Sequence, residues 1–244
     1  DRSRGLGDVY KRQILNRANA EGVGSAATYP FGRGGFEVSK LEEATAKRYL
    51  PAAELSKLKS TTASNPQCEY ARKLFLFSYY CYGISFIDMA MLTTAHIKQM
   101  EDGDYIVYKR QKIKRQKGVK PISIKITPAI RQLIGSLQAA SPTVDDFLLP
   151  IVTRSGYTGE RLYMHIRTRY SKYQKYLRLL AEELGIDFHL TSYVSRHTAA
   201  MTLQRNHIPR EVISQMLGHA DLETTNIYLD SFDNEVINEA AKVL

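Results

Sequence analysis

The chain has no tryptophan, only two cysteines, and no long apolar run among its 244 residues. Two thiols, Cys68 and Cys81, without the spacing of a metal site argue against a disulfide scaffold or a zinc module, and we expect them to be reduced. A membrane-spanning helix needs about 20 consecutive apolar residues, which no segment offers, so we expect a soluble protein without membrane partners. The sequence also has no recognisable secretory signal, internal repeat or phosphate-binding glycine loop, which favours a cytoplasmic location.

Positive charge is in excess. Lys and Arg number 34 against 25 Asp and Glu, which leaves a formal charge of +9 and a pI near 9.4. Such a balance favours an acidic polymer as partner, although charge alone does not separate DNA from RNA or an anionic membrane. The 43% hydrophobic content is sufficient for one large packed domain or two small ones.

Apolar periodicity predicts a mainly α-helical chain with one small antiparallel β-sheet, an α+β fold. Alternation predicts strands at 105–109 and 120–126, with a third near Ile97. Capping residues and apolar stripes predict helices at 14–21, 51–59, 66–82, 85–91, 127–138, 162–184, 190–205, 209–217, 222–229 and 233–244.

A basic segment joins the two main predicted strands. Residues 108–120, YKRQKIKRQKGVK, carry seven cations and no acid. Such a run usually marks a solvated surface, but a hairpin holds its geometry better than a tail would. Cations here would meet phosphates and add affinity and salt dependence rather than sequence choice. The candidates are Lys109, Arg110, Lys114, Arg115, Lys117 and Lys120.

Three residues of the last third form an ordered set: Arg196, His219 and Tyr228. A guanidinium can hold a phosphate through two parallel hydrogen bonds. A histidine can move a proton near neutral pH, and a tyrosine hydroxyl can act as a nucleophile. Any one of them alone is more often a surface or packing residue, but the ordered set predicts a site that attacks a phosphodiester.

The spacing supports this interpretation. Pro209 opens a predicted helix whose apolar stripe would be Val212, Ile213, Met216 and Leu217, and Gly218 ends it. His219 would then follow the helix end, and a short second helix would carry Tyr228 into the same cleft.

The segment 191–229, TSYVSRHTAAMTLQRNHIPREVISQMLGHADLETTNIYL, resembles the C-terminal signature of the tyrosine recombinases, the phage-integrase and Xer-like family. The sequence around these motifs is most similar to that of integrases of mobile elements such as conjugative transposons. The resemblance implies that Arg196 is the second family arginine, His219 the histidine of Leu-Gly-His and Tyr228 the nucleophile. It also implies that Lys112 of the hairpin protonates the leaving oxygen, with Lys114 the next candidate if strand alternation places both on one face.

The resemblance further implies a site-specific recombinase that integrates or recombines mobile DNA through a 3′-phosphotyrosine. Double-stranded DNA in the bacterial cytosol would be its partner. No metal or other cofactor would be needed, because the covalent link keeps the energy of the broken bond. A homotetramer would assemble on DNA through the last helix. The alternative is that this helix packs within its own protomer.

Two positions depart from the family pattern. Ser85 stands where the family has its first arginine, and the neighbouring Tyr82 supplies no cation either. Ser85 also reads as a helix N-cap with Asp88 three residues on. Arg72, one or two helical turns earlier, is a weak candidate to compensate.

The second departure is Tyr193, which stands where the family usually has a histidine and which can still donate a hydrogen bond to a phosphate. A catalytically degenerate DNA-binding protein of the same fold is therefore the alternative function. An RNA-binding module is a weaker one.

Three segments are predicted along the chain. Residues 1–13 contain LGDVYKRQ, which resembles a translated adapter sequence and predicts a non-native leader. Residues 14–48 are predicted to be the remnant of a helical core-binding domain and its linker, the alternative being an ordinary extended arm. Residues 49–244 are predicted to form the catalytic domain.

Overall fold

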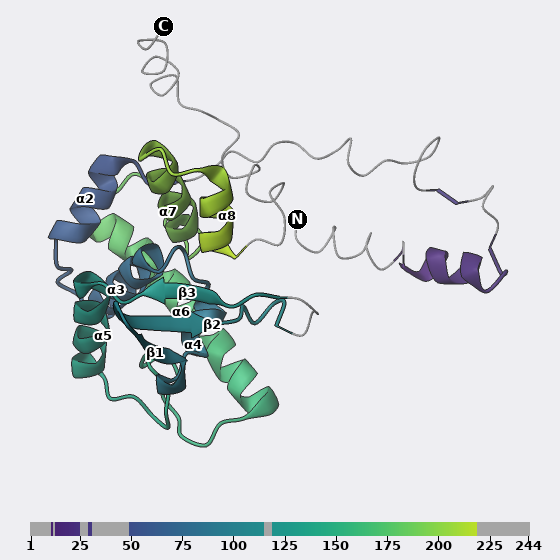
Figure 1. Ribbon diagram of the computed structural model, residues 1–244, viewed down its shortest axis with the longest axis horizontal. Coiled ribbons are helices and arrows are strands. Elements are labelled where there is room, and N and C mark those ends of the chain that lie inside the picture. The colour runs from purple at the N-terminus through teal and green to yellow at the C-terminus, as the bar shows by residue number, and fades with distance from the viewer. Residues whose placement is uncertain (1–10, 12, 25–28, 31–48, 115–118, 219–244) are drawn as a thin grey trace, which may run out of the picture. The chain divides into compact units, whose positions relative to one another are not determined.

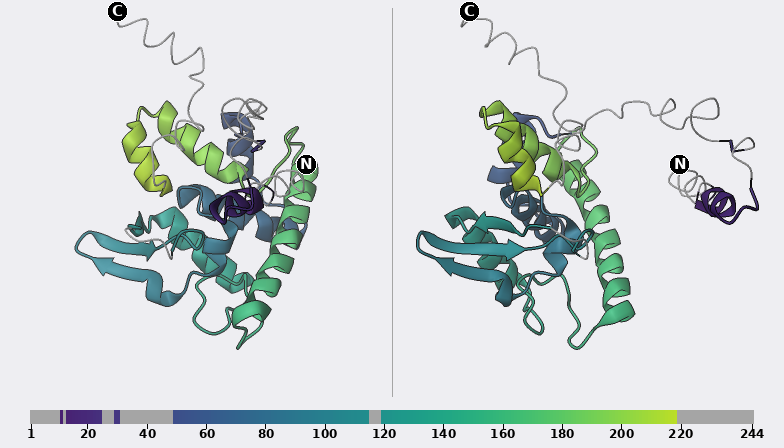
Figure 2. Two further views of the ribbon diagram at one scale, coloured as in Figure 1. Left: turned by 90° about the vertical axis from the view of Figure 1, so that its right-hand side faces the viewer. Right: turned by 45° about the vertical axis from the view of Figure 1, so that its right-hand side comes forward.

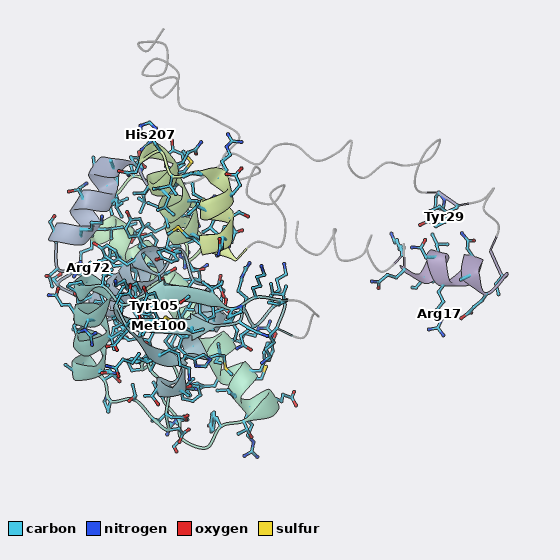
Figure 3. The ribbon with its side chains drawn as sticks, viewed as in Figure 1. Arg17, Tyr29, Arg72, Met100, Tyr105 and His207 are labelled. Carbon is cyan, nitrogen blue, oxygen red and sulfur yellow. The ribbon has the colours of Figure 1, made fainter. Side chains whose placement is uncertain are left out.

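The computed structural model describes residues 11, 13–24, 29–30, 49–114 and 119–218 (Figure 1). The chain divides into two compact units, Asp1–Ala46 and Lys47–Leu244, each considered by itself. In the first unit residues 13–20 are helical, close to the predicted 14–21. Arg17 and Glu21 form an ion pair of 2.8 Å on this helix, and the Tyr29 hydroxyl donates to Asn16 Oδ1 (Figure 3).

The second unit is mainly helical with one three-stranded antiparallel sheet, which confirms the predicted fold class. Figures 1 and 2 show the sheet and the long helix α6 on different sides of the central helix α3. The elements are α2 (Ala52–Ser60), α3 (Pro66–Tyr80), α4 (Phe86–Ala90), the 3-10 turn η3 (Thr94–His96), β1 (Ile97–Met100), β2 (Gly103–Tyr108), β3 (Ile122–Lys125), α5 (Pro128–Ala140), α6 (Gly159–Glu183), α7 (Val194–Arg205) and α8 (Arg210–Leu217).

Local chemistry explains several of these boundaries. The Asn65 side chain accepts hydrogen bonds from the first backbone N–H groups of α3, and Pro66 occupies the first helical position. The Thr127 hydroxyl caps α5 in the same way by accepting from the N–H of Ile130. Gly185 follows α6 with a φ of +58°, the left-handed conformation that ends many helices.

The sheet confirms the predicted hairpin and its third strand. β2 pairs with β1 and β3, with Ile106 opposite Ile124. Ile122, Ile124 and Ile126 of the predicted alternation are all buried. Side chains alternate between the faces of a strand, so this row covers the core while Ser123 and Lys125 face outward.

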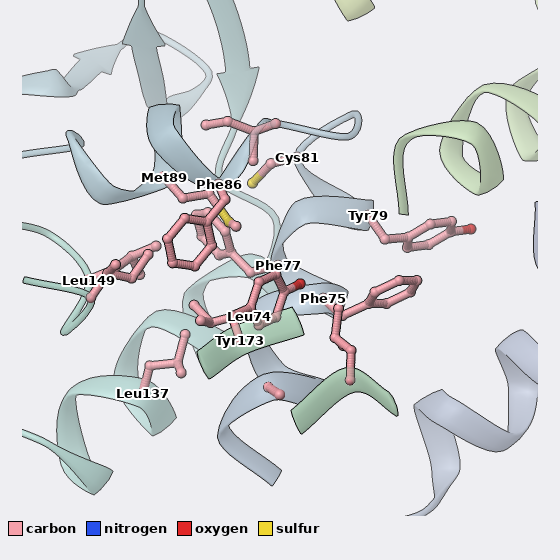
Figure 4. Close-up of a cluster of buried hydrophobic side chains, with 14 of the residues drawn as sticks. Leu74, Phe75, Phe77, Tyr79, Cys81, Phe86, Met89, Leu137, Leu149 and Tyr173 are labelled. Carbon is pink, nitrogen blue, oxygen red and sulfur yellow. The ribbon is translucent and has the colours of Figure 1, made fainter. Parts of the chain in front are cut away.

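The core surrounds α3, which packs against α2, α5, α6 and α7. Figure 4 shows Phe75 and Phe77 of this helix among side chains from α4, α5 and α6. The rings of Phe86 and Tyr173 stack with centroids 5.1 Å apart, which joins α4 to α6. None of the helices in the described ranges has the length and apolar character needed to cross a bilayer.

Two predicted helix starts were wrong. Helix α6 begins at Gly159, three residues before the predicted start, and α7 begins at Val194, four residues after it. Residues before α7 are held by α6: the N–H of Ser192 donates to Gln174 Oε1 over 2.9 Å, and its hydroxyl lies 3.1 Å from that of Tyr170. These long-range bonds hold the chain in a turn where periodicity alone predicted helix.

The predicted stripe of α8 is only partly buried. Ile213 and Leu217 are fully buried and pack in a small cluster with Ala200 and Met201 of α7, but Val212 is 42% exposed. Among the described elements this eight-residue helix packs mainly against α7 and β3, and its buried face is narrower than the sequence pattern predicted. The predicted helices 222–229 and 233–244 lie outside the described residues.

Candidate active site

Arg196 is the central described residue of the predicted site. Its side chain is 4% exposed on α7 and donates from Nη1 to the carbonyl of Gly83 over 3.1 Å and from Nη2 to that of Leu217 over 2.5 Å. It therefore joins the turn after α3 to the last residue of α8. Burial lowers the pKa of the guanidinium to about 10, with the positive charge of Arg110 the next cause. The group stays charged at neutral pH, ready to meet an anion.

Gly83 makes the close approach to Arg196 possible. Its φ is +72°, and a Cβ added there would lie 2.4 Å from the Cα of Arg196. Tyr82, the residue before it, also has a positive φ of 56°. The N–H of Gly83 donates to the carbonyl of Ser78, as in the Schellman motif that ends many helices. No side chain larger than hydrogen fits between this turn and α7.

Ser85 is the N-cap of α4, as its interpretation from the sequence predicted. Its hydroxyl accepts from the N–H of Asp88 over 3.3 Å and donates to Oδ2 of the same residue over 2.6 Å. Asp88 is 3% exposed, and its Oδ1 accepts the backbone N–H of Gln111 over 2.7 Å. From the sequence, Asp88 was predicted only to take part in the cap. Its spacing from Ser85 was a signal for the cap but not for this contact with the hairpin.

The hairpin residues differ in exposure. Lys109, Lys112, Lys114 and Lys120 are exposed, whereas Arg110 is half-buried. Residues 111–114 form a turn closed by a bond from the N–H of Ile113 to the carbonyl of Arg110, so the strand alternation proposed for Lys112 and Lys114 was wrong. The chain has already left β2 at this point. The roles assigned to these lysines stay predictions, and Arg115 and Lys117 lie outside the described residues.

Arg110 holds the end of α8. Its Nη1 donates to the carbonyl of Gly218 over 3.3 Å. Gly218 adopts a φ of +64°, and a Cβ there would lie 2.3 Å from Cδ1 of Ile122. The helix end thus packs directly on the hairpin, which confirms the predicted stop at Gly218. His219 and Tyr228 follow this point and lie outside the described residues.

A cleft of about 430 Å³ brings these residues together. Tyr193 lies at its edge as the N-cap residue of α7, 53% exposed, with its ring edge-on to that of His197 at 4.8 Å. The lining residues of α6 were not predicted, because periodicity does not reveal which helix will face a site. The lining includes Gly83, Ser85, Arg110, Tyr163, Arg167, Tyr170, Tyr193 and Arg196.

Arg72 does not supply the missing cation. Its guanidinium lies on the α2 side of α3 (Figure 3), paired with Glu69 over 2.7 Å and donating to the carbonyl of Leu58 over 2.7 Å. It is 8% exposed and absent from the lining of the cleft. The proposed compensation by Arg72 was therefore wrong, because the salt bridge within α3 directs its side chain elsewhere.

The arrangement suits an anion. Three arginines, Arg110, Arg167 and Arg196, line one cleft, and no cluster of metal-ligating side chains occurs in the described ranges. Guanidinium groups in a partly dehydrated cleft bind phosphate oxygens through charge-assisted hydrogen bonds. The described residues can thus hold a phosphodiester, while the predicted nucleophile would come from the segment after Gly218.

Comparison with known proteins agrees with this fold. Residues 48–235 match the model of the phage integrase family. The chain belongs to this family. It is 43% identical over 54 residues to tyrosine recombinase XerD of Halalkalibacterium halodurans, covering 22% of the chain and 18% of the relative. It is 31% identical over 114 residues to tyrosine recombinase XerC of Rhodospirillum centenum, covering 47% and 31%. The chain thus matches about a third or less of the length of these relatives.

Solved structures share the fold. The integrase of transposon Tn1549, in complex with transposon right end DNA, superposes with a TM-score of 0.58 at 12% identity, covering 86% of this chain and 70% of that one. The crystal structure of XerA recombinase gives 0.56 at 22% identity, covering 80% and 64%. The predicted membership of the phage integrase family is confirmed, and the two solved structures share the fold.

We expect Arg196→Lys to lower both stability and the rate of DNA cleavage. A lysine reaches one of the two buried carbonyls, and an unsatisfied buried carbonyl costs about 1–3 kcal/mol. Loss of the bidentate hydrogen bonding to phosphate should slow DNA cleavage by about 10- to 100-fold. Urea unfolding and single-turnover cleavage measure the two effects. The control is Arg205→Lys, an exposed arginine of the same helix. Equal behaviour of the two variants would contradict the role of Arg196.

Proposed function

We propose that the protein is a site-specific DNA recombinase of the integrase type, which cuts and rejoins double-stranded DNA of a mobile element. One observation carries the proposal: the buried Arg196 binds the carbonyl of Leu217, two residues before His219, in a cleft that the basic hairpin also borders. The family match and the DNA-bound Tn1549 integrase of similar fold support it.

In this mechanism the Tyr228 hydroxyl gives up its proton to water and attacks a DNA phosphate, which forms a 3′-phosphotyrosine as the bond to the 5′-oxygen breaks. Arg196 and His219 bind the non-bridging oxygens while charge develops on them. Lys112 donates a proton to the leaving 5′-oxygen. A 5′-hydroxyl of the partner strand then attacks the phosphotyrosine and releases Tyr228. Each step exchanges one phosphodiester for another, so no cofactor enters.

The experiment is covalent trapping. Duplexes bound by the protein are first selected from a random library, because the recognition sequence is unknown. The selected duplex is then nicked near the cleavage position, so that a short fragment leaves after cleavage and religation fails. A protein–DNA adduct that survives denaturation, linked through a phosphotyrosine, is the expected result. Tight DNA binding without any adduct would contradict cleavage.

That contrary result would favour the second candidate, a DNA-binding protein whose site no longer cleaves DNA. Ser85 and the exposed Tyr193 motivate it, because neither provides the cation or imidazole usual at these positions. One missing donor to a developing oxyanion costs about 2.7–4 kcal/mol in catalysis, which slows a reaction without abolishing it. The family match and the preserved cleft favour the recombinase.

DNA affinity is expected to fall steeply with salt, and Lys114→Ala should make the salt dependence shallower. Each phosphate contact contributes about 0.9 to the slope of log K against log salt. Lys114 is exposed in the turn, free to reach a phosphate. Titration of the selected duplex at several salt concentrations measures the slope. The control is Arg131→Ala, whose charge is already paired with Asp104 over 2.8 Å. The same slope in both variants would remove Lys114 from the DNA-binding surface.

We also propose a domain organisation, an assembly and a location. Residues 1–13 would be a non-native leader, 14–48 a remnant of a helical core-binding domain with its linker, and 49–244 the catalytic domain. The protein would assemble on DNA as a homotetramer through residues 233–244, which lie outside the described part of the chain. A cytoplasmic location in the bacterial cell follows from the proposed DNA substrate.

A further inference from the structure

We propose that Arg110 provides the second phosphate-binding cation of this site and takes over the function that Ser85 leaves without a charge. The inference rests on the proposed recombinase function and names a further residue that contacts the phosphate. It changes the role expected from sequence, in which Arg110 was one of several hairpin cations that add affinity. Three features of the structure support it.

First, Arg110 and Arg196 both donate hydrogen bonds to the turn at the end of α8. Arg196 donates to the carbonyl of Leu217 and Arg110 to that of Gly218, the next residue. The two guanidinium groups come from α7 and from the hairpin, so they approach the end of α8 from different elements. Both arginines also line the same cleft, so a phosphate bound there can meet both guanidinium groups.

Second, the hairpin is tied to the position of the missing arginine. The Ser85 hydroxyl donates to Asp88, and the other oxygen of this carboxylate accepts the N–H of Gln111. Gln111 is the residue next to Arg110, and Ser85 and Arg110 both line the cleft. The chain therefore brings a guanidinium to the cleft by a different element, next to the place where Ser85 has none.

Third, the charge balance of the cleft favours an anion. After burial, the charge of Arg110 is the next cause that lowers the pKa of Arg196, so the two cations are close enough to repel each other. Asp88 is the nearby carboxylate, and both of its oxygens already accept hydrogen bonds. Arg110 forms no ion pair with any described residue. An anionic phosphate between the guanidiniums would relieve their repulsion.

Arg167 is the competing cation, because it lines the same cleft from α6. It is exposed, and no hydrogen bond to another described group holds its guanidinium, so ordering it on a phosphate costs side-chain entropy. Arg110 is half-buried and already held by Gly218. The pre-ordered arginine is the better partner for a transition state, since less freedom is lost on binding.

The test compares Arg110→Gln, Arg167→Gln and Arg131→Gln. Glutamine keeps a donor for the Gly218 carbonyl but removes the charge, which separates electrostatics from support of α8. In single-turnover trapping with saturating DNA, Arg110→Gln is expected to slow adduct formation about 100- to 1000-fold. Arg131→Gln is the matched control, because Arg131 is paired with Asp104 over 2.8 Å and does not line the cleft, and it should leave adduct formation unchanged. In a methylphosphonate at the cleaved position a methyl group replaces one non-bridging oxygen, so the linkage is uncharged and should restore most of the lost rate to Arg110→Gln.

A second measurement does not depend on cleavage. Titration with inorganic phosphate, followed by NMR of ¹⁵N-labelled arginine side chains, should shift the Nε–H signals of Arg110 and Arg196 together. Arg110→Gln should weaken phosphate binding about tenfold or more, and Arg167→Gln should not. If wild-type protein forms no adduct but this pattern holds, the recombinase proposal fails and Arg110 remains a phosphate ligand. If Arg167→Gln has the larger effect, or methylphosphonate gives no rescue, the assignment of Arg110 is overturned.

Discussion

Replacing Tyr228 by phenylalanine is expected to abolish the covalent protein–DNA adduct while DNA affinity stays close to that of the wild type. The substitution removes one oxygen atom, and that atom is the nucleophile in the proposed mechanism. No neighbouring group can take its place unless it lies in line with the leaving oxygen. Denaturing gels of trapped complexes measure the adduct, and titration of the same duplex measures affinity.

Sixteen tyrosines make a matched control necessary. Tyr105 of β2 is suitable, since its hydroxyl donates only to the exposed Asp102 and it does not line the cleft (Figure 3). Tyr105→Phe should give adduct at the wild-type rate. An adduct that persists in Tyr228→Phe would show that another residue attacks the phosphate, and peptide mapping of the adduct would identify it.

Gly83→Ala is expected to destabilise the second unit by about 2–5 kcal/mol and to slow cleavage. The left-handed backbone costs an L-residue about 1–2 kcal/mol. Overpacking of a close contact adds about 1–3 kcal/mol, because the new Cβ would lie 2.4 Å from the Cα of Arg196. Relief of this clash must move α7 or the turn, either of which displaces the guanidinium from the carbonyls that hold it. Urea unfolding measures the first effect and single-turnover trapping the second.

Gly156→Ala separates the two contributions to this cost. Gly156 has a φ of +70°, nearly that of Gly83, but a Cβ there would meet nothing within 4 Å. Its alanine variant should therefore lose only the conformational part, about 1–2 kcal/mol, and keep normal cleavage. Equal losses of stability in the two variants would mean that the turn before Ser85 does not press on α7 as the structure indicates.

Much of the fold could be predicted because it depends on local chemistry. The caps at Asn65 and Thr127, the stop at Gly218 and the alternating isoleucines of β3 are each read from a few neighbouring residues, and the structure confirms them. Such signals act through backbone hydrogen bonds and side-chain direction, which a short window of sequence contains.

The wrong predictions share a cause in contacts between distant residues. The start of α7 is set by Gln174 and Tyr170 from another helix, and the direction of Arg72 by its partners Glu69 and Leu58. The exposure of Val212 depends on how α8 packs against α7 and β3, its main neighbours in the described part of the chain. None of these contacts leaves a periodic trace in the local sequence.

The sequence by itself determined the family, which the match over residues 48–235 confirms, and the order and spacing of Arg196, His219 and Tyr228 predict the proposed chemistry. Only the tertiary structure decided which charges meet. Arg110 and Arg196, far apart in sequence, bind adjacent carbonyls, and Asp88 ties Ser85 to the hairpin. Charge acts through space over a few ångströms, so the electrostatics of the cleft depend on the folded arrangement rather than on order along the chain.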